Sequence, residues 1–460
     1  MRLVISAALL LASAAPARAA DPPRKQNVLF LMADDMRPEL GCYGHPVVKS
    51  PNIDALAKAG VRFDRAFCQY PLCNPSRTSL LTGRHPTTTG VLDNTVDFRT
   101  AHPDWVALPE HFKANGYVTL KTGKIFHGGI DDTQSWTEGA EARNKGQAAK
   151  KAAPKDRRKQ SDRIVVLEGD GESHGDYAVA DRAIGFLQKY KDRPFFLACG
   201  FTKPHSPPTA PKKLFDLYDP AKLTLPRTFA ATPAAPAGFP KVSITGNGDL
   251  FMGREASEDE ARRVLQAYYA STSWTDWNVG RVVAELDKLG LRESTVIVFW
   301  GDHGYHLGEF GKWAKHGSLF EIGTRVPLIV VAPGAKGKGT AAPAPVQALD
   351  IYPTLCELCG LEPPAGIEGH SLKPLLDDAK AKWDHPAYTV ARSAKNLGVA
   401  VRTAKYRYAE WSGGKDGAML IDLAADPDET RNLVDDPKYA AVRDELSAMA
   451  RKHAAGGAAR

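Results

Sequence analysis

The stretch VLFLMADD, residues 28–35, decides the fold. Its unbroken apolar run is typical of a strand buried on both faces of a parallel sheet. Two aspartates, Asp34 and Asp35, follow the run directly. Adjacent carboxylates repel one another unless a cation lies between them, so the end of this strand is also a candidate metal site.

Further apolar runs have the same character, and helical patterns separate them. The runs lie at 117–121, 195–200, 295–300 and 328–332. The helical patterns lie at 53–59, 178–190 and 258–289. This alternation predicts an α/β fold with a large, mostly parallel central sheet and helices on both faces, in which all of these runs are parallel strands.

The pattern changes after residue 376. Short candidate strands follow at 388–391, 398–403, 406–411 and 419–423, and a closing helix begins near 439. This part predicts a small C-terminal subdomain with an antiparallel sheet and a terminal helix. We therefore expect a catalytic domain over 24–376 and a C-terminal subdomain over 377–460.

The N-terminus has the pattern of a secretory signal peptide at 1–19. A basic start at Met1-Arg2 is followed by an apolar run over 3–15 and by the small-x-small sequence Ala17-Arg18-Ala19. We expect an exported, periplasmic or secreted protein, which is bacterial in the simplest interpretation. No later run is long enough for a membrane helix, and the net charge of +7 is too weak a signal to indicate nucleic acid as a partner.

Six cysteines could pair in an exported protein, and the sequence leaves their pairing open. Cys356 and Cys359 form a CxxC without a second ligand pair, so we interpret them as structural. The segment 143–163 is rich in Lys and Arg and has few apolar residues. It is interpreted as a solvated insertion, with contact to an anionic polymer as the alternative.

Chemistry-bearing residues follow four of the strand runs. Asp302-His303 follow 295–301, Lys203 and His205 follow 195–200, and Lys124 and His127 follow 117–121. In open α/β sheets, ligands bind at the carboxyl ends of the strands, so these side chains should share one edge with Asp34 and Asp35.

The four strand-end residues Asp34, Asp35, Asp302 and His303 make a plausible divalent site. Three carboxylates favour Ca²⁺ or Mg²⁺, whereas the histidine leaves Mn²⁺ or Zn²⁺ open. The alternative is that each pair is a polar cap on a strand-to-helix turn. Around this site lie five cationic or proton-transferring residues: Lys124, His127, Lys203, His205 and Lys315. Such a cluster suggests a tetrahedral oxyanion, phosphate or sulfate.

The stretch CNPSRTSLLTGR, residues 73–84, predicts a helix and contains residues typical of its start and its end. Asn74 suits the N-cap, Pro75 the first helical position, and Gly83 the C-terminal stop. This places Cys73 just outside the helix N-terminus and Arg77 about one turn inside it. The thiol would face both a positive helix dipole and a guanidinium.

Taken together, these residues resemble the type I, formylglycine-dependent sulfatases. Their signature is matched by Cys73, Pro75, Ser76, Arg77 and the run Leu81-Thr82-Gly83-Arg84. The resemblance runs from about residue 27 to 433 and is closest to the iduronate-2-sulfatase branch. The stretches that carry it include ADDMRPELGCYG (33–44), HFKANGYVTLKTGKIFH (111–127), FTKPHSP (201–207) and GDHGYHLGEFGKWAKHG (301–317).

The resemblance implies an alkaline-phosphatase-like superfold and a specific chemistry. Cys73 would be converted to Cα-formylglycine by a maturation enzyme, and the aldehyde hydrate would be the nucleophile. One Ca²⁺ would be held by Asp34, Asp35, Asp302 and His303, with residue 73 completing the site. The remaining roles are also implied by the family: Arg77 and Lys124 hold the hydrate and the sulfate, His127 is the base for sulfate release, and His205 and Lys315 bind sulfate and protonate the departing alcohol.

The branch also implies a substrate, a sulfated saccharide from which an exo-acting enzyme removes the 2-O-sulfate of a uronic acid. Four residues beside the matched motifs are candidates for sugar contacts, with a supporting or surface role as the alternative: Asp93, Asn94, His306 and Trp313. A phosphatase or phosphonate monoester hydrolase of the same superfold is the first competing interpretation. A non-catalytic carbohydrate-binding relative is the second, although such a protein should have lost part of the signature.

Overall fold

The computed structural model describes residues 25–141, 162–393 and 395–456. The expected signal peptide at 1–19 and nearly all of the basic segment 143–163 lie outside these residues. Within the described ranges we find no helix with the length and apolar character of a membrane span. All six cysteines are free thiols, so the structure pairs none of them.

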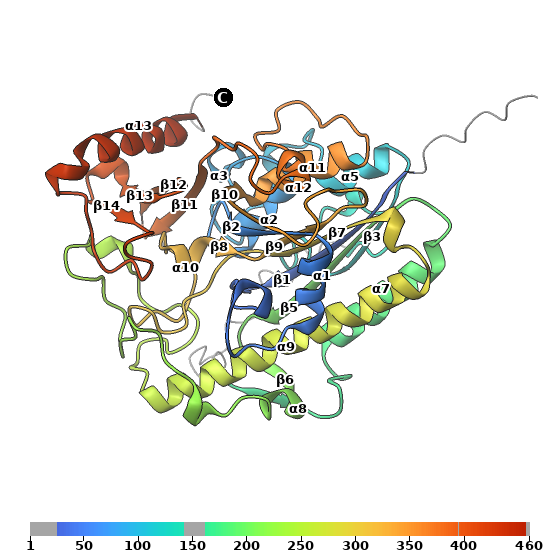
Figure 1. Cartoon of the computed structure of the whole chain (residues 1–460), viewed down its shortest axis with the longest axis horizontal. Coiled ribbons are helices and arrows are strands. Elements are labelled where there is room, and N and C mark those ends of the chain that lie inside the picture. The colour runs from blue at the N-terminus through green and yellow to red at the C-terminus, as the bar shows by residue number, and fades with distance from the viewer. Residues whose placement is uncertain (1–24, 142–161, 394, 457–460) are drawn as a thin grey trace, which may run out of the picture.

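A mixed eight-stranded sheet forms the centre of the molecule (Figure 1). Its strand order is β10-β2-β9-β7-β1-β5-β3, with β8 paired to β2. Strands β7, β1, β5 and β3 run parallel to one another, as expected. The strands are β1 (Asn27–Asp34), β2 (Val61–Phe67), β3 (Val118–Gly123), β5 (Phe195–Pro204), β7 (Thr295–Gly301), β8 (Arg325–Val326), β9 (Leu328–Val331) and β10 (Ala341–Gln347).

The structure corrects the sequence prediction at three strands. The run 328–332 forms β9, which is antiparallel to both β7 and β2. A fully buried strand is apolar in either direction, so its composition does not reveal its orientation. The sequence analysis missed β2, whose apolar residues are interrupted by charged ones, and β10, which contains Pro343 and Pro345. Prolines are tolerated in β10 because it is an edge strand.

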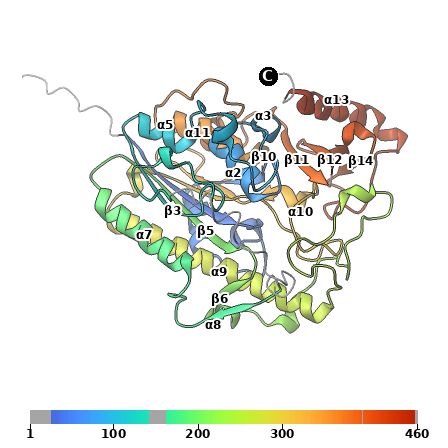
Figure 2. The same ribbon diagram turned by 180° about the vertical axis from the view of Figure 1, so that it is seen from behind.

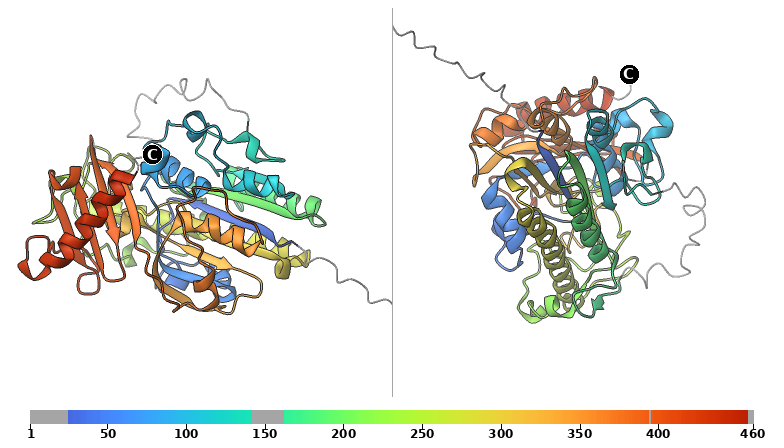
Figure 3. Two further views of the ribbon diagram at one scale, coloured as in Figure 1. Left: turned by 90° about the horizontal axis from the view of Figure 1, so that it is seen from above. Right: turned by 90° about the vertical axis from the view of Figure 1, so that its right-hand side faces the viewer.

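Helices cover both faces of the sheet, with α1, α7 and α9 on one side and α2, α5 and α11 on the other (Figure 3). Strand β1 is buried between these layers, since Leu29 and Leu31 pack into one apolar cluster and Val28 and Phe30 into the other. This double burial explains its continuous apolar run. The longer helices are α1 (Pro51–Ala59), α2 (Cys73–Thr82), α5 (Leu108–Ala114), α7 (Gly175–Tyr190), α9 (Glu258–Lys288), α11 (Ile351–Leu358) and α13 (Ala440–Gly456).

Shorter elements connect these layers. The short helices are α3 (Pro86–Thr89), α4 (Phe98–Ala101), α8 (Lys212–Phe215), α10 (Glu321–Thr324) and α12 (Lys373–Asp377). A separate two-stranded sheet pairs β4 (Val165–Leu167) with β6 (Thr209–Pro211). From behind, α7 and α9 lie side by side below the central sheet (Figure 2).

The C-terminal part forms a four-stranded antiparallel sheet, as the sequence predicted. Its outer face packs against α13 through Leu446 and Ala450. Its inner face packs against the larger, N-terminal part of the molecule through residues such as Trp411 and Phe320. The boundary at 376/377 stays a prediction. The strands are β11 (Ala387–Ser393), β12 (Asn396–Arg402), β13 (Tyr406–Trp411) and β14 (Ala418–Asp422).

Candidate active site

The register of the central strands brings the predicted site residues together. Ala33 on β1 pairs with Gly301 on β7, so the two aspartates after β1 lie beside Asp302 and His303. On the other side, Gly123 on β3 pairs with Gly200 on β5. Lys124 therefore follows β3 at the same edge of the sheet.

A buried acidic centre lies at this edge. Cys73 Sγ is 3.3 Å from Asp34 Oδ1 and 3.4 Å from His303 Nε2. His303 Nε2 is in turn 3.3 Å from Asp35 Oδ1 and 3.5 Å from Asp302 Oδ1. All of these side chains are at most 2 % exposed. Within the described residues, the ligand atoms of Asp34, Cys73, Asp302 and His303 converge within 4.8 Å.

The donor atoms fit a divalent cation. His303 Nδ1 lies 3.0 Å from the Gly304 carbonyl, which can only accept a hydrogen bond, so Nδ1 carries the proton. In the neutral ring, Nε2 then directs its lone pair at the surrounding carboxylates, an arrangement typical of a metal-ligating histidine. Asp35 Oδ1 is buried and accepts no hydrogen bond in the structure. A cation between these atoms would satisfy both groups.

Three cations, of which Arg77 and Lys315 are buried and Lys124 is partly exposed, offset the three carboxylates. Arg77 Nε is 2.9 Å from Asp302 Oδ2, and Lys315 Nζ is 2.8 Å from Asp35 Oδ2. Lys124 pairs with Asp34. The formal charges of these six side chains therefore cancel. A bound divalent cation would leave the centre positive and suited to an anionic ester.

The pKa values of the carboxyls follow from this packing. Burial raises the pKa of Asp34, but Lys124 and the other cations outweigh it and hold the pKa well below its usual value. Burial also raises the pKa of Asp35, but the charges of His205 and Lys315 outweigh this effect and lower the pKa. For Asp302, burial and the adjacent charge of Asp34 raise the pKa. Burial also raises the pKa of the Cys73 thiol, which makes an unmodified cysteine a weak nucleophile here.

Helix α2 begins two residues earlier than the sequence predicted. Cys73 is its first residue and Leu72 occupies the N-cap, so the prediction that Asn74 caps the helix is wrong. The cap comes from elsewhere, because Asn94 Oδ1 accepts a hydrogen bond of 3.0 Å from the Asn74 backbone N–H. Gly83 ends the helix in the left-handed conformation, at φ 64°, as expected.

The two predicted histidines lie on different sides of the centre. His205 Nε2 is 3.8 Å from Asp35 Oδ2, and its Nδ1 is 2.8 Å from the Ser206 carbonyl. His127 Nδ1 is buried without a hydrogen-bond partner in the structure. Burial, with a further contribution from Lys124, lowers the pKa of His127 to about 3. His127 is therefore neutral at pH 7.

The four candidates for sugar contact divide into two pairs. Asp93 and Asn94 lie at the N-terminus of α2, where the Asp93 carbonyl accepts a hydrogen bond of 2.9 Å from Asn74 Nδ2. His306 and Trp313 have no exposed surface. His306 Nε2 instead contacts Ser318 Oγ at 2.7 Å. Both side chains are therefore core residues in this structure. Their contact with a saccharide stays a prediction.

Sequence analysis missed two side chains that make hydrogen bonds to the backbone of the site segments. Asp35 has a left-handed backbone, with φ 64°, and the Tyr268 hydroxyl donates a hydrogen bond of 2.7 Å to its carbonyl. Asp176 accepts hydrogen bonds from the backbone N–H groups of Thr202 and Lys203, which precede His205. Both supports come from helices distant in sequence, α9 and α7, and no local pattern indicates them.

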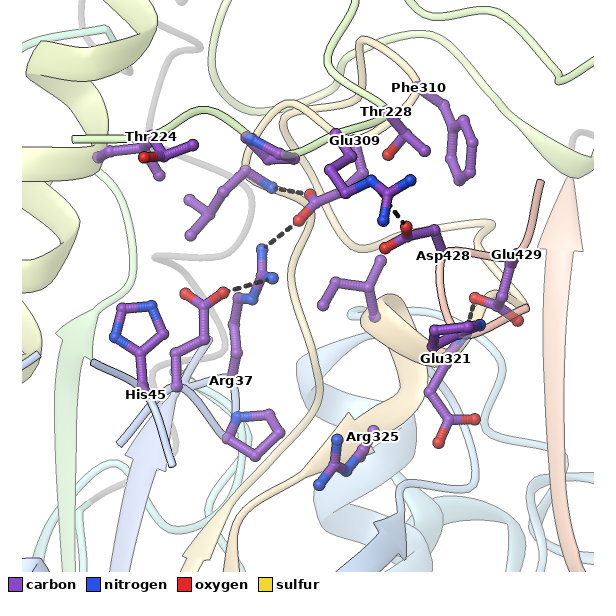
Figure 4. A pocket seen from close by; sticks show the side chains of 18 of the residues that line it. Arg37, His45, Thr224, Thr228, Glu309, Phe310, Glu321, Arg325, Asp428 and Glu429 are labelled. Atoms are coloured by element: carbon purple, nitrogen blue, oxygen red, sulfur yellow. Dashed lines mark hydrogen bonds and ion pairs between the residues drawn. The ribbon is translucent and has the colours of Figure 1, made fainter. Parts of the chain in front are cut away.

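Two cavities border this region. One, of about 600 Å³, is lined by Lys124 and His127 and lies beside the catalytic centre. The other, of about 330 Å³, contains none of the predicted site residues (Figure 4). Its central Arg37 pairs with Glu39 at 2.7 Å and with Glu309 at 2.9 Å. This second cavity is thus crossed by an ion-pair network whose charges are largely matched internally.

The fold and the buried centre define an α/β protein with an alkaline-phosphatase-like fold and a candidate metal site. Two family comparisons identify it further. The Sulfatase family matches residues 26–361, and the family described as N-sulphoglucosamine sulphohydrolase, C-terminal, matches residues 308–455. The chain belongs to the sulfatase family and is an iduronate-2-sulfatase-like hydrolase.

Relatives agree with this assignment, and solved structures share the fold. Iduronate 2-sulfatase of Mus musculus is 31% identical, covering 91% of this chain and 93% of its own. An ulvan-active sulfatase of Formosa agariphila is 31% identical, covering 94% and 81%. A phosphonate monoester hydrolase of Agrobacterium radiobacter shares the fold with a TM-score of 0.74 at 23% identity, covering 94% and 96%. A 2-O GAG sulfatase does so with a TM-score of 0.71 at 23% identity, covering 95% and 93%.

Proposed function

We propose that this sulfatase removes the 2-O-sulfate from a terminal sulfated uronic acid of a saccharide. The observation that carries the reaction type is the buried centre, in which Cys73 begins α2 between three carboxylates and three cations. The observation that supports the substrate is the 31% identity to an iduronate 2-sulfatase over nearly the whole chain. Exo action and the uronic acid are part of the proposal.

We further propose that Cys73 is matured to Cα-formylglycine and that the metal is Ca²⁺. The aldehyde hydrate would supply the attacking oxygen, and the cation would favour its ionised form. Asp34, Asp35, Asp302 and His303 are the residues that would hold the ion. Three carboxylates among these four residues are the donor set that calcium prefers.

We assign the remaining side chains the roles that the family resemblance implies, and their positions support this part of the proposal. Arg77 fixes the site, since its Nη1 donates to the carbonyls of Lys124 and Ile125 while its Nε binds Asp302. Lys315 and His205 lie on the Asp35 side, where they would bind sulfate and protonate the departing alcohol. Neutral His127 would take up the proton that must be lost for sulfate to leave.

The proposal includes the cellular context. The signal-peptide pattern at 1–19 supports a periplasmic or secreted enzyme. A formylglycine-generating or sulfatase-maturing enzyme would then be a required partner, acting on the CNPSR segment before it is buried. In the folded chain, Cys73 is only 2 % exposed, so maturation after folding would need the site to open.

A substrate panel tests this function. The matured enzyme should release free sulfate from 2-O-sulfated uronic acid at the non-reducing end of a disaccharide. It should release much less from the 6-O-sulfated isomer and from the same unit placed internally. Matched aryl phosphate and phosphonate esters test the alternative chemistry. Faster release of phosphate than of sulfate from paired aryl esters would contradict the proposal.

Replacing each of the two histidines should slow a different step of the reaction. His205→Ala should slow a sugar sulfate more than an aryl sulfate with an acidic phenol, by up to roughly 10²–10⁴-fold, because an acidic phenol leaves without protonation. His127→Ala should slow both substrates equally and should release a burst of alcohol ahead of sulfate, because its step follows loss of the alcohol.

Pre-steady-state measurement of both products distinguishes these outcomes. Wild-type enzyme and His385→Ala, whose exposed imidazole stacks on His370 outside the centre, serve as controls. A burst in His205→Ala but not in His127→Ala would show that the roles are reversed. Equal losses on both substrates in His205→Ala would show that it is not the acid.

A further inference from the structure

Strand β11 carries an arginine from the C-terminal sheet to the segments that hold the catalytic residues. The Arg392 backbone N–H donates a hydrogen bond of 2.9 Å to the Tyr70 hydroxyl, three residues before Cys73. On its other side, the Arg392 carbonyl oxygen approaches Gly317, which lies two residues after Lys315. A Cβ placed on this glycine would be 3.4 Å from that oxygen. Arg392 is thus held between the nucleophile segment and the Lys315 segment.

The side chain of Arg392 faces solvent. Its neighbours Ala391 and Ser393 are at most 5 % exposed, whereas Arg392 itself is exposed. Among the described residues, its guanidinium makes no hydrogen bond or ion pair. The nearby carboxyl of Asp93 has a lowered pKa, mainly because Thr95 donates to it, with a smaller contribution from the charge of Arg392.

This free guanidinium differs from the cations of the centre. Arg77, Lys124 and Lys315 are each paired with a buried aspartate. They can serve the reacting sulfate, but their charges are already matched by the protein. Arg392 is an exposed cation on a strand whose backbone contacts the nucleophile segment, and no described carboxylate forms an ion pair with it.

We propose that Arg392 binds a second anionic group of the substrate, a carboxylate or a further sulfate on the saccharide. A guanidinium recognises either group through two parallel hydrogen bonds, which a lysine cannot reproduce. Arg392 would then select polyanionic saccharides over simple sulfate esters. The inference rests on the proposed function, because it names a specificity residue for that same site.

The test compares Arg392→Ala and Arg392→Lys with wild-type enzyme on four substrates. These are a 2-O-sulfated uronic acid disaccharide, its carboxyl-reduced form, a form with an additional sulfate, and an aryl sulfate with no second anion. Arg182→Ala is the matched control, since Arg182 is also exposed but lies on α7. Melting temperatures verify that each variant is folded.

We expect Arg392→Ala to raise KM for the uronate substrate by about 10- to 100-fold and to leave the aryl sulfate unchanged, since charged hydrogen bonds contribute on this scale. Arg392→Lys should raise KM for the uronate substrate by a smaller factor. If the effect disappears with the carboxyl-reduced substrate, the bound group is the carboxylate; if it persists there and grows with the additional sulfate, the bound group is a sulfate. An equal loss on the aryl sulfate, or no loss on any substrate, would overturn the proposal.

Affinity measured without turnover separates this inference from the proposed function. Isothermal titration of the same disaccharides into Cys73→Ala protein, with and without Arg392→Ala, reports binding alone. A 10- to 100-fold weaker binding in the double variant supports the role of Arg392 even if the wild-type reaction were of another type. Unchanged binding would refute that role even if sulfate release were confirmed.

Discussion

Replacing Cys73 by serine is expected to abolish measurable turnover, a loss of at least about 10³-fold, because the nucleophile is removed. Serine differs from cysteine by a single atom and would keep the start of α2 and its contacts. An unoxidised serine carries a single hydroxyl, so it lacks the second one through which sulfate could be expelled. The loss should therefore be in kcat, measured as free sulfate from the uronate disaccharide.

The matched control for this change is Cys42→Ser. Cys42 is a partly exposed thiol outside the site, where it donates its backbone N–H to Asp54. This variant should keep close to full activity. Turnover by Cys73→Ser within about tenfold of the wild type would rule out residue 73 as the nucleophile.

The second large effect concerns Asp302. Asp302→Asn keeps the shape of the side chain but removes one of the negative charges that face His303 and Cys73. We expect the metal to be lost or much weakened and activity to fall by about 10³-fold, since a metal ion supplies several kcal/mol at such a centre. Metal content by elemental analysis and sulfate release should fall together. Chelation of the wild type should have the same effect, and added Ca²⁺ should restore activity.

Asp276→Asn is the control for a buried aspartate outside the centre. Asp276 accepts hydrogen bonds from the backbone of Ile53 and the side chain of Asn52. Its replacement can lower the melting temperature but should leave the metal content unchanged. If Asp302→Asn retained both its metal and its activity, the assignment of the centre would be wrong.

The sequence predicted that the residues after β1 and β7 would lie together, because the end of a buried strand can be recognised in a sequence. A continuous apolar run that stops at Asp34-Asp35 or at Asp302-His303 marks both a buried strand and its carboxyl end. In a parallel sheet those ends share one edge, so proximity followed without knowing the strand order. The observed register, with Ala33 beside Gly301, supplied the precise neighbours.

Other features depended on tertiary contacts that no local pattern carries. The orientation of β9 was wrong because burial, and not direction, determines its composition. The cap of α2 comes from Asn94, twenty residues from its partner Asn74, so the local cap signal at Asn74 was misleading. Trp313 and His306 lie in a matched motif yet are core residues, since proximity in sequence does not determine which side chains face the solvent.

The most direct test of the central claim is the mass of the peptide that contains residue 73, taken from an active preparation. The enzyme should be produced with its maturation system, assayed for sulfate release and then digested. We predict the mass of the aldehyde, trapped by a hydrazide, in a proportion that rises with specific activity across preparations. A fully active preparation in which residue 73 is an unmodified thiol would contradict the account.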